Sequence, residues 1–160
     1  MKKNFARLLV AALMATSLSV ALPAQQASAY SGSTGKGCTA YQYGYGGYST
    51  CISYIQQMLN GINLAYGQNY GGSSLAVDAS FGPRTKTQVQ RFQKWTGLKV
   101  DGVVGPRTWQ ELCSWAGQVF FKYSHAGSIR NKAWSAAYNA GCYVERPTSG
   151  GIGYETISRY

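Results

Sequence analysis

The amino-acid sequence predicts a mainly α fold from two observations: a repeated pattern of turn residues and the apolar periodicity that follows each copy. The pattern occupies residues 77–85 and 100–108, and six of its nine positions are identical. Each copy contains a Gly-Pro pair. Pro suits the first helical position, where its missing N–H group costs nothing, and the Gly before it is a suitable N-cap. Because repeated patterns indicate repeated structural units, we expect two equivalent turns that each begin a helix.

The polar residues of the repeated pattern have a structural explanation. The aspartate carboxylate of each turn can accept backbone N–H groups and hold the turn closed. We therefore interpret the repeated residues as a scaffold rather than as ligand contacts. They are Asp78, Gly82, Pro83 and Thr85 in the first turn, and Asp101, Gly105, Pro106 and Thr108 in the second.

Helical periodicity follows both turns. The first of these helices is expected from Pro83 to about Thr96, ended by Gly97, and the next from Pro106 to about Ala116. At 100° per residue, one stripe of each helix should face the core. These stripes are Thr85, Val89, Phe92 and Thr96 in the first, and Trp109, Leu112 and Ala116 in the second. A further helix over residues 128–140 and a short strand over residues 152–157 are expected nearer the C-terminus.

The double pattern resembles the peptidoglycan-binding domain of the first type, a three-helix module found on many bacterial wall enzymes. Members carry a helix with a Leu-Gln pattern and then two copies of Asp-Gly-x-x-Gly-Pro-x-Thr. The resemblance implies a first helix over residues 50–60, where Gln56, Gln57 and Leu59 match. It also implies a small three-helix peptidoglycan-binding-like bundle over residues 50–117, with disulfide-tied N- and C-terminal extensions.

The sequence departs from the family pattern in two places. Ala79 replaces the expected Gly in the first turn, so this turn either avoids a positive φ or loses about 1 kcal/mol. Residues 62–74 form a longer and more Gly- and Tyr-rich stretch than the family usually has. Both departures affect ligand details near the first turn rather than the fold.

Four side chains form a second stripe on the helix that begins at Pro83, and they are our main candidates for ligand binding: Arg84, Gln88, Arg91 and Trp95. Two cations, an amide and an indole on one face suit contact with a wall polymer. An equally favoured alternative is that Trp95 packs at the edge of the core while the arginines maintain solubility. Tyr54 of the first helix is a weaker candidate.

The N-terminus has the pattern of a secretory signal over residues 1–29. Three basic residues precede an apolar run at residues 8–22, which is shorter than a comfortable membrane span, and Ala27-Ser28-Ala29 is typical of a cleavage site. We therefore expect a secreted, cell-wall-associated protein without a membrane span after cleavage. Residues 30–49 read as a Gly- and Tyr-rich leader, for which a flexible segment is favoured over a sugar-stacking arm. Residues 118–160 read as a basic, aromatic C-terminal extension of unknown role.

The four cysteines indicate disulfides, because exported proteins fold in an oxidising compartment. Four cysteines allow three pairings. We favour Cys38–Cys51 with Cys113–Cys142, since each pair is local to its own segment. The main rival is Cys51–Cys113 with Cys38–Cys142, which would join the first helix to the third.

No catalytic centre is predicted from the sequence. A zinc site needs about three protein ligands, and the chain has a single histidine, His125. Paired cysteines provide no free thiolate. Glycosidases need two carboxylates facing a cleft, but Asp78 and Asp101 are explained by the turns, and Glu111, Glu145 and Glu155 have no evident partner. We expect no metal and no cofactor.

The formal net charge of +10 predicts an anionic partner. Peptidoglycan stem peptides carry carboxylates, and teichoic acids carry phosphates, both of which arginine binds well. Nucleic acid is not expected for an exported chain. The sequence thus favours a secreted, non-catalytic protein that binds peptidoglycan. Two alternatives stay open: a cell-wall hydrolase with its site in residues 118–160, and an inhibitor or interaction protein that docks a secreted partner.

Overall fold

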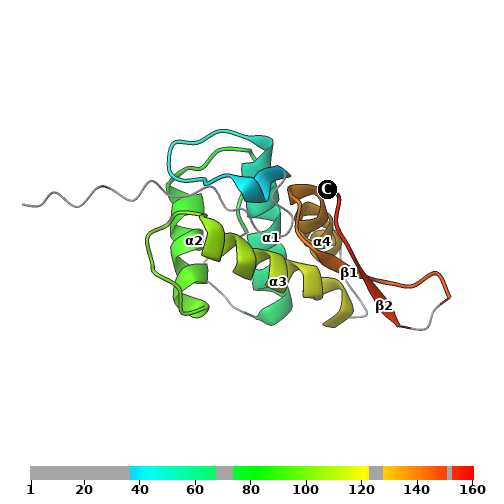
Figure 1. Ribbon diagram of the computed structural model, residues 1–160. Helices are drawn as coiled ribbons and strands as arrows, with labels where there is room; N and C mark the ends of the chain where they lie inside the picture. Colours follow the sequence, from blue (N-terminus) through cyan, green and yellow to red (C-terminus); the bar gives the residue numbers. More distant parts are fainter. Residues whose placement is uncertain (1–36, 68–73, 123–127, 151–152) are drawn as a thin grey trace, which may run out of the picture.

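The computed structural model describes residues 37–67, 74–122, 128–150 and 153–160. The expected signal segment 1–29, the leader residues before Gly37, and His125 lie outside these residues. The described elements, in chain order, are one 3-10 helix, four α-helices and a two-stranded sheet (Figure 1). They are η1 (Gly37–Ala40), α1 (Thr50–Tyr66), α2 (Pro83–Trp95), α3 (Pro106–Lys122), α4 (Ser128–Ala140), β1 (Val144–Pro147) and β2 (Tyr154–Ile157).

Helix α1 is longer than the expected 50–60. It begins after Ser49, whose side chain accepts a hydrogen bond from the backbone N–H of Cys51, and it ends at Gly67, which has a left-handed φ of 62°. The helix continues because Ile62 and Ala65 extend the apolar face that Ile55 and Leu59 begin. Gly61 lies inside the helix and does not end it.

Helices α2 and α3 begin at the two Gly-Pro pairs, as expected. Helix α2 ends within one residue of the prediction, but α3 continues six residues past the expected end at Ala116, to Lys122. Val119 extends its buried face, and α3 lies next to Val144 at Gly117. The expected boundary at residue 117 therefore lies inside a continuous helix.

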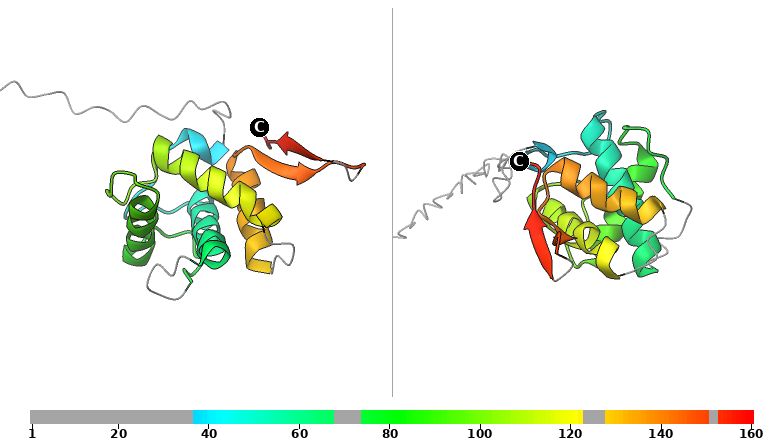
Figure 2. Two further views of the ribbon diagram at one scale, coloured as in Figure 1. Left: turned by 90° about the horizontal axis from the view of Figure 1, so that it is seen from below. Right: turned by 90° about the vertical axis from the view of Figure 1, so that its right-hand side faces the viewer.

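Helix α4 matches its predicted bounds and packs against both α1 and α3 (Figures 1 and 2). Its alanines Ala133, Ala136, Ala137 and Ala140 are at most 1% exposed. A Cβ at Gly61 would overlap the Cβ of Ala133, so α1 and α4 approach each other closely. The mainly α fold class is confirmed, but the bundle contains a fourth helix that the sequence assigned to an extension.

Beyond α4, the C-terminal extension contains the antiparallel hairpin of β1 and β2, which projects from the helical body (Figure 2). Val144 pairs with Ile157, and Pro147 with Tyr154. The expected strand over residues 152–157 corresponds to β2, and its first residue lies outside the described part of the chain.

Two disulfides join separate elements. Cys38–Cys51 ties η1 to the start of α1, and Cys113–Cys142 ties α3 to the residues after α4. This is the favoured pairing, and the rival pairing is wrong. No helix of the described residues is long and apolar enough to cross a membrane.

Candidate functional site

One glutamine holds the first turn from inside. The Nε2 group of Gln56, on α1, donates to Asp78 Oδ1 (2.8 Å), to the Ser80 carbonyl (3.0 Å) and to Thr85 Oγ1 (3.2 Å). Its Oε1 atom accepts from the backbone N–H groups of Asp78 and Ala79. The Gln56 donor, followed by the N–H of Ser80, lowers the pKa of the Asp78 carboxyl because both stabilise its charged form.

A second glutamine holds the second turn in the same way. Gln93 Nε2, on α2, donates to Asp101 Oδ1 (2.9 Å), to the Val103 carbonyl (2.9 Å) and to Thr108 Oγ1 (3.2 Å). The N–H of Gly102 donates to its Oε1. Each buried amide thus reaches the same three positions of its turn, so the repeated residues form the scaffold that their pattern predicts.

The two turns differ at one backbone position. Gly102 has a φ of 73°, and the equivalent Ala79 has a φ of 64°. Of the two outcomes open from the sequence, the structure has the strained one: Ala79 adopts the left-handed conformation, which is unfavourable for a residue with a Cβ.

The leader pairs with both turns. Tyr43 exchanges two backbone hydrogen bonds with Val104 in the second turn, and Gly46 and Gly47 bond to Phe81, the equivalent residue of the first. The indole N–H of Trp109 donates to the Tyr41 carbonyl at 2.9 Å. The expectation of a flexible leader is therefore wrong for residues 37–49: residues 37–40 form η1, and residues 41–49 bridge the two turns.

A groove of about 550 Å³ opens at the second turn, beside the start of α3. We call it the second-turn groove. Gln93 and Thr108 lie buried at its base, with their polar groups paired within the turn. The side chains of Lys99 and Arg107 are exposed and bring positive charge to it, and Gln42 of the leader lines it as well. The backbone N–H groups at the N-terminus of a helix, here α3, have no partner within the helix and favour anions. The groove therefore suits a ligand that carries a carboxylate.

The first turn lacks one of these cations. With the 23-residue offset between the turns, Arg84 is equivalent to Arg107, but Ala76 is equivalent to Lys99. Asn60 also holds the backbone of Leu75 with two hydrogen bonds, 2.9 and 2.7 Å long. The two turns share a scaffold but present different surfaces.

The predicted stripe on α2 divides between solvent and core. Arg84 is exposed and Arg91 is half-buried, but Gln88 is only 9% exposed. Around the helix axis, Gln88 lies about 40° closer to the core stripe than Arg84 does. Trp95 is half-buried, with its ring centroid 4.6 Å from that of Trp115. Its position matches the alternative in which the indole packs at the core edge. None of these four residues lines the second-turn groove.

Tyr54 is half-buried and lines a different cavity, between the leader and the C-terminal residues. The structure thus brings Arg84 and Arg91 together on one helix and places Tyr54 elsewhere.

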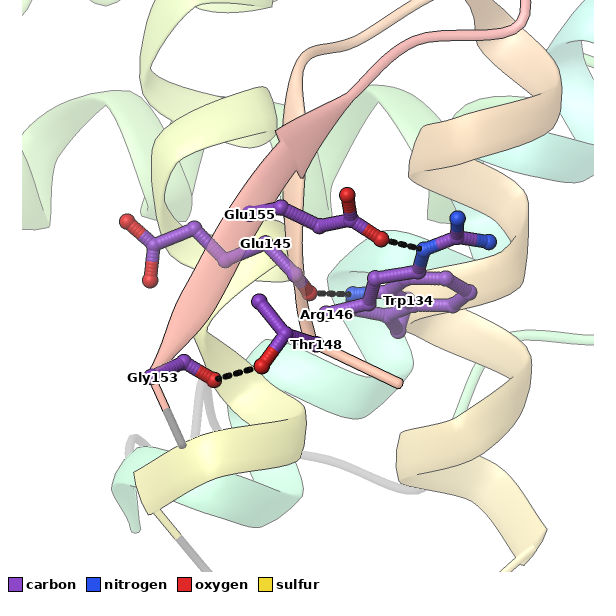
Figure 3. Close-up of polar contacts among 6 residues, drawn as sticks. All are labelled: Trp134, Glu145, Arg146, Thr148, Gly153 and Glu155. Atoms are coloured by element: carbon purple, nitrogen blue, oxygen red, sulfur yellow. Dashed lines mark hydrogen bonds and ion pairs between the residues drawn. The ribbon is translucent and has the colours of Figure 1, made fainter. Parts of the chain in front are cut away.

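The carboxylates of the extension do not face each other. Glu155 forms an ion pair with Arg146, with a distance of 2.6 Å between Oε1 and Nε, and the Trp134 indole donates to the backbone carbonyl of Glu145 (Figure 3). Glu145 pairs with Thr156 and Arg146 with Glu155, so Glu145 and Glu155 lie on opposite faces of the hairpin. Their side chains point away from each other in Figure 3. Glu111 accepts a hydrogen bond from the Trp115 indole. The described residues contain no group of three potential metal ligands.

Comparison with known families gives a match for the central segment. Residues 52–112 match the model of the family described as "Putative peptidoglycan binding domain". The resemblance seen in the sequence is confirmed for this segment. This central segment contains both turns, Gln56 and Gln93, and all of the second-turn groove except Gln42.

Two curated relatives match parts of the chain. An uncharacterized protein in the bpoA1 3' region of Kitasatospora aureofaciens is 46% identical over 72 residues, which are 42% of this chain and 61% of the relative. A zinc D-Ala-D-Ala carboxypeptidase of Streptomyces albus G is 51% identical over 41 residues, which are 26% of this chain and 16% of the relative. The chain thus spans less than two thirds of the length of either relative.

One solved structure is also similar. It is a peptidoglycan-binding protein from Clostridioides difficile, crystallised in complex with glutamine hydroxamate. The sequence identity is 32%, the match covers 45% of this chain and 40% of that one, and the TM-score is 0.37.

Sequence reasoning missed several residues that line the second-turn groove: Gln42, Gln93, Lys99 and Arg107. Gln93 could have been found from the sequence, because it lies on the helix before the second turn just as Gln56 lies on the helix before the first. Lys99 was detectable as a cation directly before the second copy of the pattern, where Ala76 precedes the first copy. Gln42 was not, since only the leader's pairing with the turn brings it to the groove.

Proposed function

We propose that this protein is secreted, non-catalytic and binds the peptidoglycan of bacterial cell walls through its central segment. The observation that supports this most is the family match over residues 52–112, combined with the cationic second-turn groove on that segment. Export is supported by the signal pattern of residues 1–29 and by two disulfides, which persist in oxidising compartments.

The second-turn groove is the proposed ligand site. Stem-peptide carboxylates of peptidoglycan match its charge, because Lys99, Arg107 and the start of α3 all favour an anion there. Asp101 is the one carboxylate that lines the groove, and its Oδ1 atom already accepts from Gln93 and from the N–H of Val103. Arg84 and Arg91 on α2 are a separate proposed contact. They would bind anionic parts of the same polymer, including teichoic acids.

The absence of catalysis is part of the proposal. It is supported by the placement of Glu145 and Glu155 on opposite faces of the hairpin, since glycosidases need two carboxylates that face one cleft. The hydrolase alternative is favoured by one observation, the partial similarity to a zinc carboxypeptidase. Loss of turbidity in a wall suspension, abolished by Glu145→Gln or Glu155→Gln, would support that alternative and contradict ours.

Co-sedimentation with purified peptidoglycan tests the site. A Lys99→Ala/Arg107→Ala variant should lose about tenfold or more in affinity, as expected when charge-assisted hydrogen bonds are removed. An Arg84→Ala/Arg91→Ala variant removes the same charge from α2 and serves as the matched comparison. If only the α2 variant loses retention, the ligand binds α2 rather than the groove; if neither does, both assignments are wrong.

A further inference from the structure

A second groove is lined mainly by residues outside the central segment 52–112. Its volume is about 440 Å³, within the range of small-molecule sites. The leader, the start of α1 and the end of the described chain form it together, and we call it the terminal groove. Its aromatic and polar lining comprises Tyr41, Tyr43, Tyr54, Asn139, Arg159 and Tyr160. Of these, only Tyr54 falls within residues 52–112.

The tyrosines give the terminal groove apolar faces with polar edges. Tyr41 is 64% exposed and Tyr160 is 51% exposed, whereas Tyr43 and Tyr54 are half-buried. The Tyr43 ring is fixed from behind by an edge-to-face contact with Trp109, at 5.9 Å between centroids. Rings of this kind offer large contact area at low conformational cost, and their faces suit the C–H groups of a sugar ring.

Arg159 brings a positive charge to the terminal groove. Its Nη1 donates to Asn139 Oδ1 at 2.8 Å, and its guanidinium carbon lies 5.9 Å from the centroid of the Tyr160 ring. No carboxylate of the described residues is within ion-pairing distance of it. A neutral amide therefore orients the guanidinium and leaves its other donors for an anion.

The groove is held in place before any ligand arrives. The Cys38–Cys51 disulfide forms part of its wall. Gly37 packs against the ring of Tyr160: a Cβ there would lie 2.5 Å from Tyr160 Cε2 and 3.0 Å from the Ala140 carbonyl. Preorganisation of this kind lowers the cost of binding.

We propose that the terminal groove binds an acidic amino sugar, a pyranose that carries a carboxylate. The tyrosine rings contact the sugar, and Arg159 binds the carboxylate through its planar fork. The proposal rests on the proposed function, because the glycan of the wall would supply this ligand wherever the lactyl carboxyl group is not linked to a stem peptide. It adds a second point of attachment, formed by the leader and the C-terminal residues instead of the repeated turns.

The test uses two probes that differ by one acidic group: N-acetylmuramic acid, and N-acetylglucosamine, which lacks the lactyl carboxylate. Each is titrated into the purified protein while NMR follows the backbone amides and the Arg159 Nε–H signal. We expect N-acetylmuramic acid to shift signals around the groove and to bind at least about tenfold more tightly than N-acetylglucosamine.

Variants identify the groups responsible. Arg159→Gln should weaken binding of the acidic sugar about tenfold and leave the neutral sugar nearly unchanged. Tyr41→Ala should weaken both. Tyr48→Ala and Lys132→Gln remove an exposed ring and an exposed charge outside the groove, and should change neither.

The proposal is overturned if the two sugars bind equally, if neither shifts the groove signals, or if Arg159→Gln and Tyr41→Ala have no effect. Co-sedimentation of the same protein with peptidoglycan separates this failure from that of the proposed function. Retention on peptidoglycan without sugar binding in the terminal groove removes only the inference. Absence of retention removes the proposed function.

Discussion

Gln56 and Gln93 are the residues that connect each helix to the turn it supports. Gln93 is 1% exposed; its Nε2 lies within hydrogen-bond distance of three acceptors of the second turn, and its Oε1 accepts from the N–H of Gly102. Its removal leaves several polar groups of that turn without their partner, a loss that is costly in a protein interior. The second-turn groove lies on this turn, so the scaffold and the proposed ligand site depend on the same amide.

Replacement of this amide should therefore destabilise the fold. Gln93→Ala is expected to lower the free energy of unfolding by about 2–3 kcal/mol, measured by urea denaturation. Gln110→Ala, at an exposed position of α3, is the matched control and should change it by less than about 0.5 kcal/mol. Equal effects of the two substitutions would contradict the role of Gln93.

Ala79 and Gly102 allow opposite substitutions at equivalent positions. Ala79→Gly should stabilise the protein by about 0.5–1 kcal/mol, because it relieves a left-handed conformation at the expense of some unfolded-state entropy. Gly102→Ala should destabilise it, since a Cβ there would lie 2.9 Å from Lys86 Cγ in addition to the backbone strain. Thermal denaturation of both variants checks the signs, and a fall in melting temperature for Ala79→Gly would refute the first.

Asp78 should make the stability of the fold depend on pH in the acidic range. Its pKa in the folded protein is lowered, so its contribution is present above the ordinary aspartate pKa of about 3.9 and is lost as the pH falls through the lower folded value. Asp78→Asn should therefore flatten the loss of stability below about pH 4. Denaturation midpoints of both proteins at a series of pH values test this, and parallel curves would show that Asp78 contributes nothing.

At the scale of elements, helix starts were predictable and packing partners were not. The Gly-Pro pairs located α2 and α3 because their chemistry is local. The pairing of the leader with Phe81 and Val104 involves residues far apart in sequence, and no local sequence pattern predicts it. Helix α4 was predicted as a helix, but its packing was not, because its buried face consists of alanines and gives no strong periodic signal. Gly61, which allows α4 to pack closely against α1, is a residue that usually disfavours a helix.

Gly61 offers a direct test of how α4 is packed. Alanine usually stabilises a helix relative to glycine, but Gly61→Ala should destabilise this protein by about 1–3 kcal/mol because the new methyl overlaps Ala133. Gly117→Ala, where a Cβ would lie 3.4 Å from Val144 Cγ1, is the helical control and should be close to neutral.

The double variant Gly61→Ala/Ala133→Gly completes the cycle for this contact. It should recover part of the lost stability, since the second change removes the opposing methyl group. A stabilised Gly61→Ala protein would mean that α1 and α4 do not approach each other closely.

On the scale of the whole molecule, the described parts of the terminal segments pack with the central helices. The leader bridges the two turns, α4 contributes to the helical core, and the two disulfides connect terminal residues to α1 and to α3. The sequence identified the peptidoglycan-binding resemblance and the scaffold, whereas the two grooves emerge only where distant segments meet. The proposed attachment to the wall therefore belongs to the folded chain and not to the repeated pattern alone.

Co-sedimentation of the purified protein with peptidoglycan stripped of teichoic acid tests the central claim most directly. It is run at low salt and at about 0.5 M salt, where diffuse charge attraction is largely screened. The structure predicts retention at both salts, since recognition rests on a formed groove with oriented donors. Release at high salt, or absence of binding at either, would contradict specific recognition of peptidoglycan and leave only the basic charge of the chain to explain any attachment.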